Sequence, residues 1–494
     1  MTIRYLHNDP DAVPFLESRR SARPARVGAV AKFSLSHPPA EQIYPIGDPG
    51  FVFWQCRQAA LLAIEAWELV SGPLRSWQSG SRLLILDPNR AVGLEANYDR
   101  ASVSFNRWPV QGTTTFTGAS TDAVSHEVGH AILDAVRPDL WDSLFAEVAA
   151  FHEGFADCVT LLVALFDNKV VDALFNGAPN PKHVLDAGNL AGQVAESVAS
   201  AFLSSFGAHH PNSRPRQLKN QLQWAIPTTL PANPTPTNLS REPHSFGRVF
   251  SGCVYDTIDN IYQSRPRHTR RALKQAATTA GALLAAAVKS APEDIRFYRA
   301  VGRAMILADD DQNGGANHVA IRDAFAAHGI ALGSAVMLAA TMALEGPPPP
   351  VRGAASRRLN PRTRRDLSVR VGSDGPTRMS IEPVQLGGRR VAKVKLRRKI
   401  PLVNVSGSLQ GVMAHVNEEL LLGAERKYCV VLGELPNSAA SDIEVSAFAR
   451  SLADSGALEH PADRSRKPTH AIRKRDGRKF LKRVRFSCVP AGYQ

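Results

Sequence analysis

Cysteine is scarce in this chain of 494 residues: there are five, an odd number, and they are widely spaced. No C-x-x-C pair occurs, so the sequence indicates neither a disulfide framework nor a zinc site made of thiolates. No run of about 18 apolar residues is free of charge or strong punctuation, so no transmembrane helix is predicted. The N-terminal stretch lacks an apolar segment behind a basic start, so no signal peptide is predicted and a cytoplasmic location is expected.

Acidic residues are scarce in the last part of the chain. Residues 351–494 contain 29 of the 59 Lys and Arg residues but only 13 of the 45 Asp and Glu residues, a balance of +16, which leaves −2 for residues 1–350. This asymmetry predicts a separate basic module with its own partner. The length predicts two or three domains, and the 44% hydrophobic and 21% charged residues are typical of a globular protein.

Hydrophobic periodicity predicts helices and strands in successive parts of the chain. A helix is expected at 51–70, followed by strands at 82–86 and 95–105, and the second strand alternates apolar and polar residues. Asp122 is the predicted N-cap of a helix that ends at Arg137. Further helices are expected at 144–166, 246–262, 270–287, 294–307 and 318–327.

The composition changes after four consecutive prolines at 347–350. A Pro- and Arg-rich linker is expected at 341–365, followed by a basic accessory domain at 366–494. This domain is predicted to be rich in β-structure, with a hairpin that turns at Asp476-Gly477. Its strands are expected at 367–371, 391–396 and 428–432, and one helix at 443–452.

The strongest chemical signal is the pentapeptide His126-Glu127-Val128-Gly129-His130. Two histidines four residues apart lie on one face of a helix and can bind the same ion. Glu127 is placed to act as the general base for a metal-bound water, which is the H-E-x-x-H arrangement of zinc hydrolases. The alternative interpretation is two surface histidines on an amphipathic helix.

Two acids on the next expected helix supply a further metal ligand. Glu153 and Asp157 are four residues apart in an apolar segment, where buried acids are costly unless a metal ion compensates them. Glu153 is the predicted third ligand, and Asp157 is predicted to accept the second ring N–H of a ligating histidine, His126. Glu147 is an alternative third ligand, and His152 is expected beside the site. Three protein ligands plus water would make the zinc catalytic.

The chain resembles the gluzincin metallopeptidases of the thermolysin and fungalysin type over about residues 30–335. H-E-V-G-H-A-I-L-D at 126–134 is similar to their active-site helix, and H-E-G-F-A-D at 152–157 to their glutamate-ligand helix. Three more segments are similar in the same order: E-A-N-Y at 95–98 to the edge strand, H-S-F-G-R-V-F-S-G-C-V-Y-D at 244–256 to the helix led by a histidine, and D-Q-N-G-G-A-N-H-V-A-I-R-D-A-F-A-A-H-G-I at 311–330 to the closing helix.

The resemblance implies an α+β, two-lobed fold with one zinc ion per chain in the cleft. A flexible lead-in at 1–30 would precede a mixed lobe with an antiparallel sheet at 31–166 and a helical lobe at 167–340. His244 would donate a hydrogen bond to the tetrahedral oxyanion, and the backbone at Ala96 would pair with an extended peptide. The implied activity is that of a zinc endopeptidase acting on peptides or proteins.

The sequence also departs from the family pattern in three places. Residues 131–152 contain no tyrosine, and Glu95 stands where the family favours asparagine. No acidic cluster of the calcium-binding kind follows Asp157, which leaves calcium dependence open.

The basic C-terminal part offers a second hypothesis about function. Lys393, Lys395 and Arg397 would share one face of a strand, and a second basic cluster spans 473–485. These clusters predict a surface for nucleic acid or another polyanion, or simply a solvated basic face. The alternative to the endopeptidase is therefore a catalytically idle zincin scaffold that binds through this domain. An aminopeptidase is a further alternative, although no G-x-M-E-N-type motif occurs.

Overall fold

The structure of the protein is a computed structural model, which describes twelve stretches of the chain. They are residues 2–7, 16–20, 30–45, 47–93, 95–110, 113–185, 218–232, 238–333, 336–349, 358–371, 378–459 and 468–488. Helices and strands occupy separate regions, so the predicted α+β class is confirmed. Most of the expected lead-in at 1–30 lies outside the described residues.

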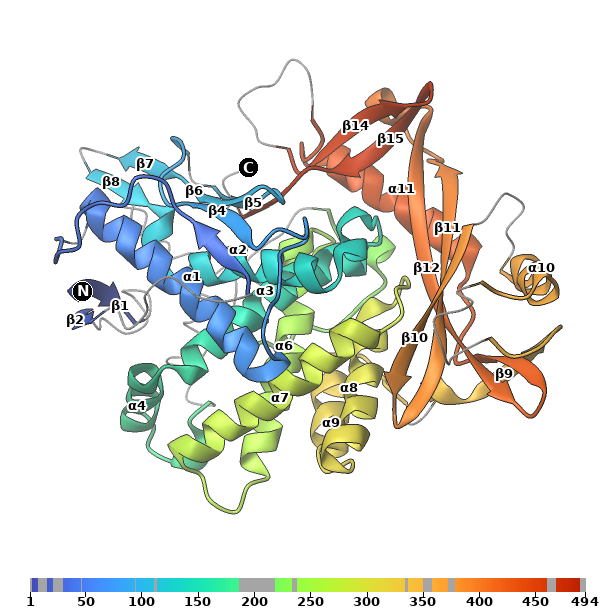
Figure 1. The fold of residues 1–494 in the computed structure, drawn as a ribbon, viewed down its shortest axis with the longest axis horizontal. Helices are drawn as coiled ribbons and strands as arrows, with labels where there is room; N and C mark the ends of the chain where they lie inside the picture. Colours follow the sequence, from blue (N-terminus) through green and yellow to red (C-terminus); the bar gives the residue numbers. More distant parts are fainter. Residues whose placement is uncertain are drawn as a thin grey trace.

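A small sheet forms the first layer of the structure (Figure 1). Its strand order is β16-β5-β6-β4-β3. The pairs β16–β5 and β5–β6 are antiparallel, whereas β6–β4 and β4–β3 are parallel, so the sheet is mixed and the expectation of an antiparallel sheet was wrong for half of its pairs. The sheet strands are β3 (Lys32–Ser34), β4 (Leu83–Asp87), β5 (Ala96–Tyr98), β6 (Ser102–Phe105) and β16 (Phe486–Cys488). Two hairpins accompany it, β1 (Thr2–Leu6) with β2 (Leu16–Arg20) and β7 (Arg107–Val110) with β8 (Thr113–Phe116).

Helix α2 (Thr121–Val136) packs against β5 and β6 of this sheet, and helices α1 (Pro49–Ser71) and α3 (Ala146–Phe166) pack against α2 and each other. The N-cap of α2 is Ser120, whose hydroxyl accepts a hydrogen bond from the Ala123 amide at 2.9 Å. The prediction that Asp122 is the cap was therefore wrong. Asp122 lies in the first turn instead, where its charge still suits the helix dipole.

Glycines allow α2, α3 and α6 (Pro243–Gln263) to approach each other closely. A Cβ atom on Gly129 of α2 would lie only 2.7 Å from the Cα atom of Ala156 of α3. A Cβ atom on Gly247 of α6 would lie 2.8 Å from the Ala150 carbonyl oxygen and 2.9 Å from Cβ of Glu153. Both crossings therefore depend on the missing side chain.

A helical region follows α3 in the chain. Its helices are α4 (Asn168–Gly177), α6, α7 (Arg270–Ser290), α8 (Phe297–Asn313) and α9 (His318–Ala327). Helix α3 is long and apolar enough to cross a membrane by length and composition, but its apolar window is completely buried inside the protein. That burial is the ordinary situation of a core helix, and α3 contacts α1, α2, α6, α7 and α8.

The C-terminal part forms a seven-stranded sheet in the order β10-β11-β12-β13-β9, with β15 pairing with both β12 and β14 (Figure 1). Its strands are β9 (Ala340–Leu344), β10 (Arg378–Leu386), β11 (Arg389–Pro401), β12 (Val412–Glu425), β13 (Tyr428–Leu432), β14 (His470–Arg475) and β15 (Arg478–Arg483). Helix α11 (Ser438–Asp454) packs beside it. The predicted hairpin at Asp476-Gly477 is confirmed, with positive φ at both turn residues.

Two predictions near the start of this part need revision. The strand expected at 367–371 was wrong, because α10 (Pro361–Arg370) runs through it. The Asn360 side chain caps this helix by accepting a hydrogen bond from the Arg362 amide at 3.0 Å, and Pro361 stands in its first turn. Strand β9 and helix α10 also occupy both ends of the expected 341–365 linker.

The C-terminal sheet is joined to the helices by buried charges. The Arg137 guanidinium, at the C-cap of α2, contacts Glu419 of β12 at 3.2 Å, and Lys395 of β11 contacts Asp139 at 2.7 Å. Lys393 is 2% exposed and pairs with Glu419 at 3.4 Å. Lys393 and Lys395 therefore face the protein interior and not an external polyanion.

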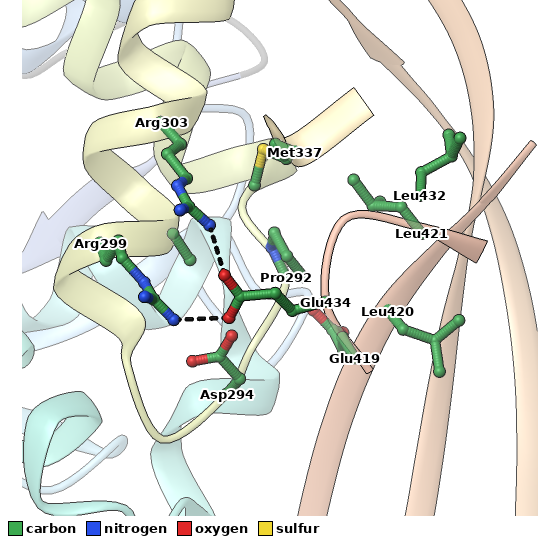
Figure 2. A pocket seen from close by; sticks show the side chains of 11 residues that line it. Pro292, Asp294, Arg299, Arg303, Met337, Glu419, Leu420, Leu421, Leu432 and Glu434 are labelled. Atoms are coloured by element: carbon green, nitrogen blue, oxygen red, sulfur yellow. Dashed lines mark hydrogen bonds and ion pairs between the residues drawn. The ribbon is translucent and has the colours of Figure 1, made fainter. Parts of the chain in front are cut away.

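A second set of charges joins the same two parts around a small pocket. Arg299 and Arg303 of α8 both contact the Glu434 carboxylate, at 2.6 and 3.3 Å (Figure 2). The pocket measures about 40 Å³. It has room for a few water molecules, not for a peptide.

Candidate metal centre

Helix α2 places two histidines side by side in the protein interior. His126 and His130 are 1% and 0% exposed, and their rings meet edge to face with centroids 4.8 Å apart. Because they are four residues apart on one helix, both side chains reach the same point beside α3. The alternative of two surface histidines is excluded by this burial.

Glu153 of α3 meets both histidines. Its Oε2 atom lies 3.3 Å from Nε2 of His126 and 3.6 Å from Nε2 of His130. Zinc bonds of about 2.0–2.2 Å in a tetrahedron place neighbouring ligand atoms roughly 3.3–3.6 Å apart. Ligand atoms of the three residues all lie within 4.8 Å of one another, and no other such group of His, Cys, Asp and Glu side chains occurs among the described residues. The donor spacing therefore fits a metal ion.

Asp157 supports this arrangement from behind. Its Oδ1 atom lies 2.8 Å from Nδ1 of His126, so that Nε2 of the same ring is directed to Glu153. An Nδ1–H that donates to Asp157 leaves the Nε2 lone pair available for a metal. The predicted contact between Asp157 and His126 is therefore present.

The electrostatics of the site favour ligand forms that bind metal. Burial lowers the pKa of His130, which favours the neutral imidazole. Burial alone would raise the pKa of the Glu153 carboxyl, but the neighbouring imidazoles, with His244 contributing most, hold it well below its usual range. Glu127 lies fully buried between the two histidines in sequence, and its charge acts on His130.

His244 reaches the same carboxylate from the first turn of α6. Its Nε2 atom lies 3.2 Å from Oε2 of Glu153, and its Nδ1 atom contacts Glu242, the N-cap of the helix. His244 is not a member of the group whose ligand atoms lie within 4.8 Å of one another. The structure thus separates three potential ligands from one further imidazole that faces the same space.

Glu147, the alternative third ligand, has other partners. Its carboxylate accepts hydrogen bonds from the Trp224 indole at 2.9 Å and the Tyr298 amide at 3.1 Å. His152 lies beside the site, as expected, with its ring centroid 6.0 Å from that of His130.

Ala96 begins β5, the strand expected to bind substrate. One edge of β5 pairs with β6, and the other edge pairs with β16, where Ala96 is opposite Cys488 and Tyr98 is opposite Phe486. The ring of Phe486 stacks on His130, with centroids 4.5 Å apart. Sequence reasoning missed this contact, because no local pattern indicates that the end of the chain pairs with β5.

Comparisons with known proteins add no assignment: no known protein family matches this chain, and no curated protein sequence matches it. The function has to be inferred from the geometry of the site.

Proposed function

We propose that this protein is a zinc-dependent endopeptidase. The observation that carries the proposal is the convergence of His126, His130 and Glu153 within 4.8 Å in a buried site. Two imidazoles and one carboxylate form a donor set that suits zinc, whereas calcium and magnesium prefer oxygen ligands alone. Three protein ligands leave a coordination position for a reactant.

When bound, zinc would act as a Lewis acid that polarises a peptide carbonyl and lowers the pKa of a water molecule. Glu127 would take the proton of the attacking water and deliver it to the leaving amine. His244 would donate its Nε2–H to the oxyanion. In other hydrolases, a hydrogen-bond donor of this kind stabilises the transition state by about 2.7–4 kcal/mol. Asp157 would hold His126 in the ligating orientation.

The substrate would be an extended polypeptide. Strand β5 contacts helix α2, which carries the two histidines, and its edge now paired with β16 would offer a peptide backbone hydrogen bonds that do not depend on side chains. A chain bound in this way can continue in both directions, which favours an endopeptidase over an aminopeptidase.

The test is cleavage of casein and of a quenched fluorescent peptide by the purified protein, with zinc measured by atomic absorption. Glu127→Gln should keep its zinc and lose hydrolysis by about 10²–10⁴-fold, the usual contribution of a general base. Glu147→Gln is the matched control, because it changes a buried acid of α3 outside the metal group; it should keep both zinc and hydrolysis. Hydrolysis that survives in Glu127→Gln would exclude this mechanism.

A binding scaffold is the second candidate, and the hairpin of β14 and β15 favours it. Arg473, Lys474, Arg475, Arg478 and Lys479 are all exposed on this hairpin. Such a cluster suits a polyanion, whose binding would weaken steeply with salt. Zinc binding without hydrolysis, combined with salt-dependent binding of nucleic acid, would support the scaffold.

A further inference from the structure

The end of the chain returns to the candidate metal centre. After the β14–β15 hairpin of the C-terminal sheet, the chain crosses to the first sheet and forms β16 against β5 (Figure 1). Lys482 contacts Asp142 at 2.6 Å, and Nε of Arg483 donates to the Trp141 carbonyl at 3.0 Å. These contacts hold the crossing segment beside the 3-10 helix at Pro138–Asp142, which follows α2.

Strand β16 pairs with the edge of β5 that β6 leaves open. Among the described residues, three pairs join the two strands in an antiparallel register, with Ser487 opposite Asn97 between the other two pairs. Strand β6 already occupies the other edge of β5. Since a strand has only two edges, no second polypeptide can pair with β5 while β16 is present.

The leading side chain of β16 lies against the site. Phe486 is 2% exposed, and its ring stacks on His130 at 4.5 Å and on His152 at 4.2 Å between centroids. Trp141 lies edge-on to it at 5.3 Å, and the Arg483 guanidinium lies 4.1 Å from the ring centroid. An aromatic side chain from an extended strand thus has a built position next to a potential metal ligand.

We propose that β16 is an internal occupant of the peptide-binding edge and must leave β5 before a polypeptide can bind there. This inference rests on the proposed function. It also identifies the ligand class: an extended peptide antiparallel to β5, with an aromatic residue against His130 and His152. Among the described residues, which end at Cys488, the pairing comprises three residue pairs, compared with nine between β10 and β11.

The experiment measures binding directly and does not depend on hydrolysis. A fluorescein-labelled synthetic peptide with the sequence of residues 481–488 is titrated with zinc-loaded protein and followed by anisotropy. All proteins carry Glu127→Gln, so that the probe is not cleaved. The intact chain is compared with a chain that ends at Arg485, and a second probe carries alanine in place of Phe486.

The truncated chain should bind the probe at least about tenfold more tightly than the intact chain, because a tethered strand competes at an effective concentration of about a millimolar. The alanine probe should bind more weakly than the parent probe. Intact-length Phe486→Ala should also bind the probe more tightly than the unaltered chain, which covers the case that truncation impairs folding. Phe480→Ala is its matched control, because Phe480 stacks on His415 in the neighbouring hairpin, away from β5.

The proposal would be overturned if the intact and truncated chains bound the probe equally, or if neither Phe486→Ala nor the truncated chain bound it. Either result would mean that β16 is a permanent part of the site. A parallel cleavage assay on chains with Glu127 restored separates the two ideas. Probe binding after truncation without cleavage would contradict the endopeptidase proposal but support the proposal that β16 occupies the peptide-binding edge. Equal cleavage before and after truncation, with no probe binding, would contradict the proposed role of β16 and leave the endopeptidase proposal standing.

Discussion

Replacing Gly129 with alanine should damage the metal centre more than it damages the fold. The new Cβ atom would lie 2.7 Å from Cα of Ala156, and an ordinary contact begins at 3.4 Å, so α2 and α3 must separate by about 0.7 Å. Backbone atoms cannot rotate away as a side chain does. The displacement therefore falls on the two helices that carry His126 and Glu153.

The magnitudes predict a small loss of stability and a large loss of affinity. Overpacking typically costs about 1–3 kcal/mol, while alanine gains about 1 kcal/mol over glycine inside a helix. If the full shift reaches the ligands, the distance between His126 and Glu153 grows from 3.3 Å to about 4.0 Å. That exceeds the roughly 3.3–3.6 Å edge of a zinc tetrahedron. We expect zinc affinity to fall on the order of 10–100-fold, the range seen when ligand support is lost.

Competition with a fluorescent zinc chelator measures this affinity, and thermal unfolding of the zinc-free protein measures stability. Gly302→Ala is the matched control. A Cβ atom there would lie 2.6 Å from side-chain atoms of Leu332 and Phe325, in a crossing outside the metal group. The Gly302→Ala variant should have a lower melting temperature and an unchanged zinc affinity. Zinc affinity that is unchanged in Gly129→Ala would refute the close-crossing argument.

Two further changes test the support of the site and the buried charges. Asp157→Asn should weaken zinc binding about 10–100-fold, because the amide is a poorer acceptor for the His126 ring N–H; chelator competition measures this, and unchanged affinity would show that the contact is incidental. The pKa of Glu293 is raised from 4.5 to about 8, mainly by burial and further by repulsion from the Asp139 and Glu419 carboxylates. The folded protein therefore keeps a proton that the unfolded chain loses, and the free energy of unfolding should fall between about pH 5 and 8, by up to about 1.4 kcal/mol per pH unit. Glu293→Gln should reduce this slope in urea titrations with chelator present, and an unchanged slope would contradict the assignment.

Local sequence patterns were sufficient for the elements and for the candidate ligands. The spacing of His126 and His130 places both on one helix face, and an apolar segment with Glu153 and Asp157 one turn apart predicts a buried helix with two acids on one side. These features depend on neighbours within one or two turns, so they can be read without the fold. The hairpin at Asp476-Gly477 is local in the same sense, since both turn residues adopt positive φ.

Competing signals in neighbouring residues explain two wrong predictions, the strand at 367–371 and the N-cap at Asp122. Apolar alternation at 367–371 favoured a strand, but the Asn360-Pro361 start signal prevailed and produced α10. At α2, Ser120 and Asp122 are both good N-caps, and only the position at which the backbone leaves the extended conformation decides between them.

The sequence by itself determined which side chains could bind a metal, because helical periodicity sets their relative direction. Tertiary structure decided which of them meet. The crossing of α2 and α3 at Gly129 selects Glu153 and leaves Glu147 to Trp224. Folding also turns Lys393 inward and brings β16 onto β5. Such pairings join segments far apart in the chain, and their free energy depends on burial and on strand edges that exist only after folding.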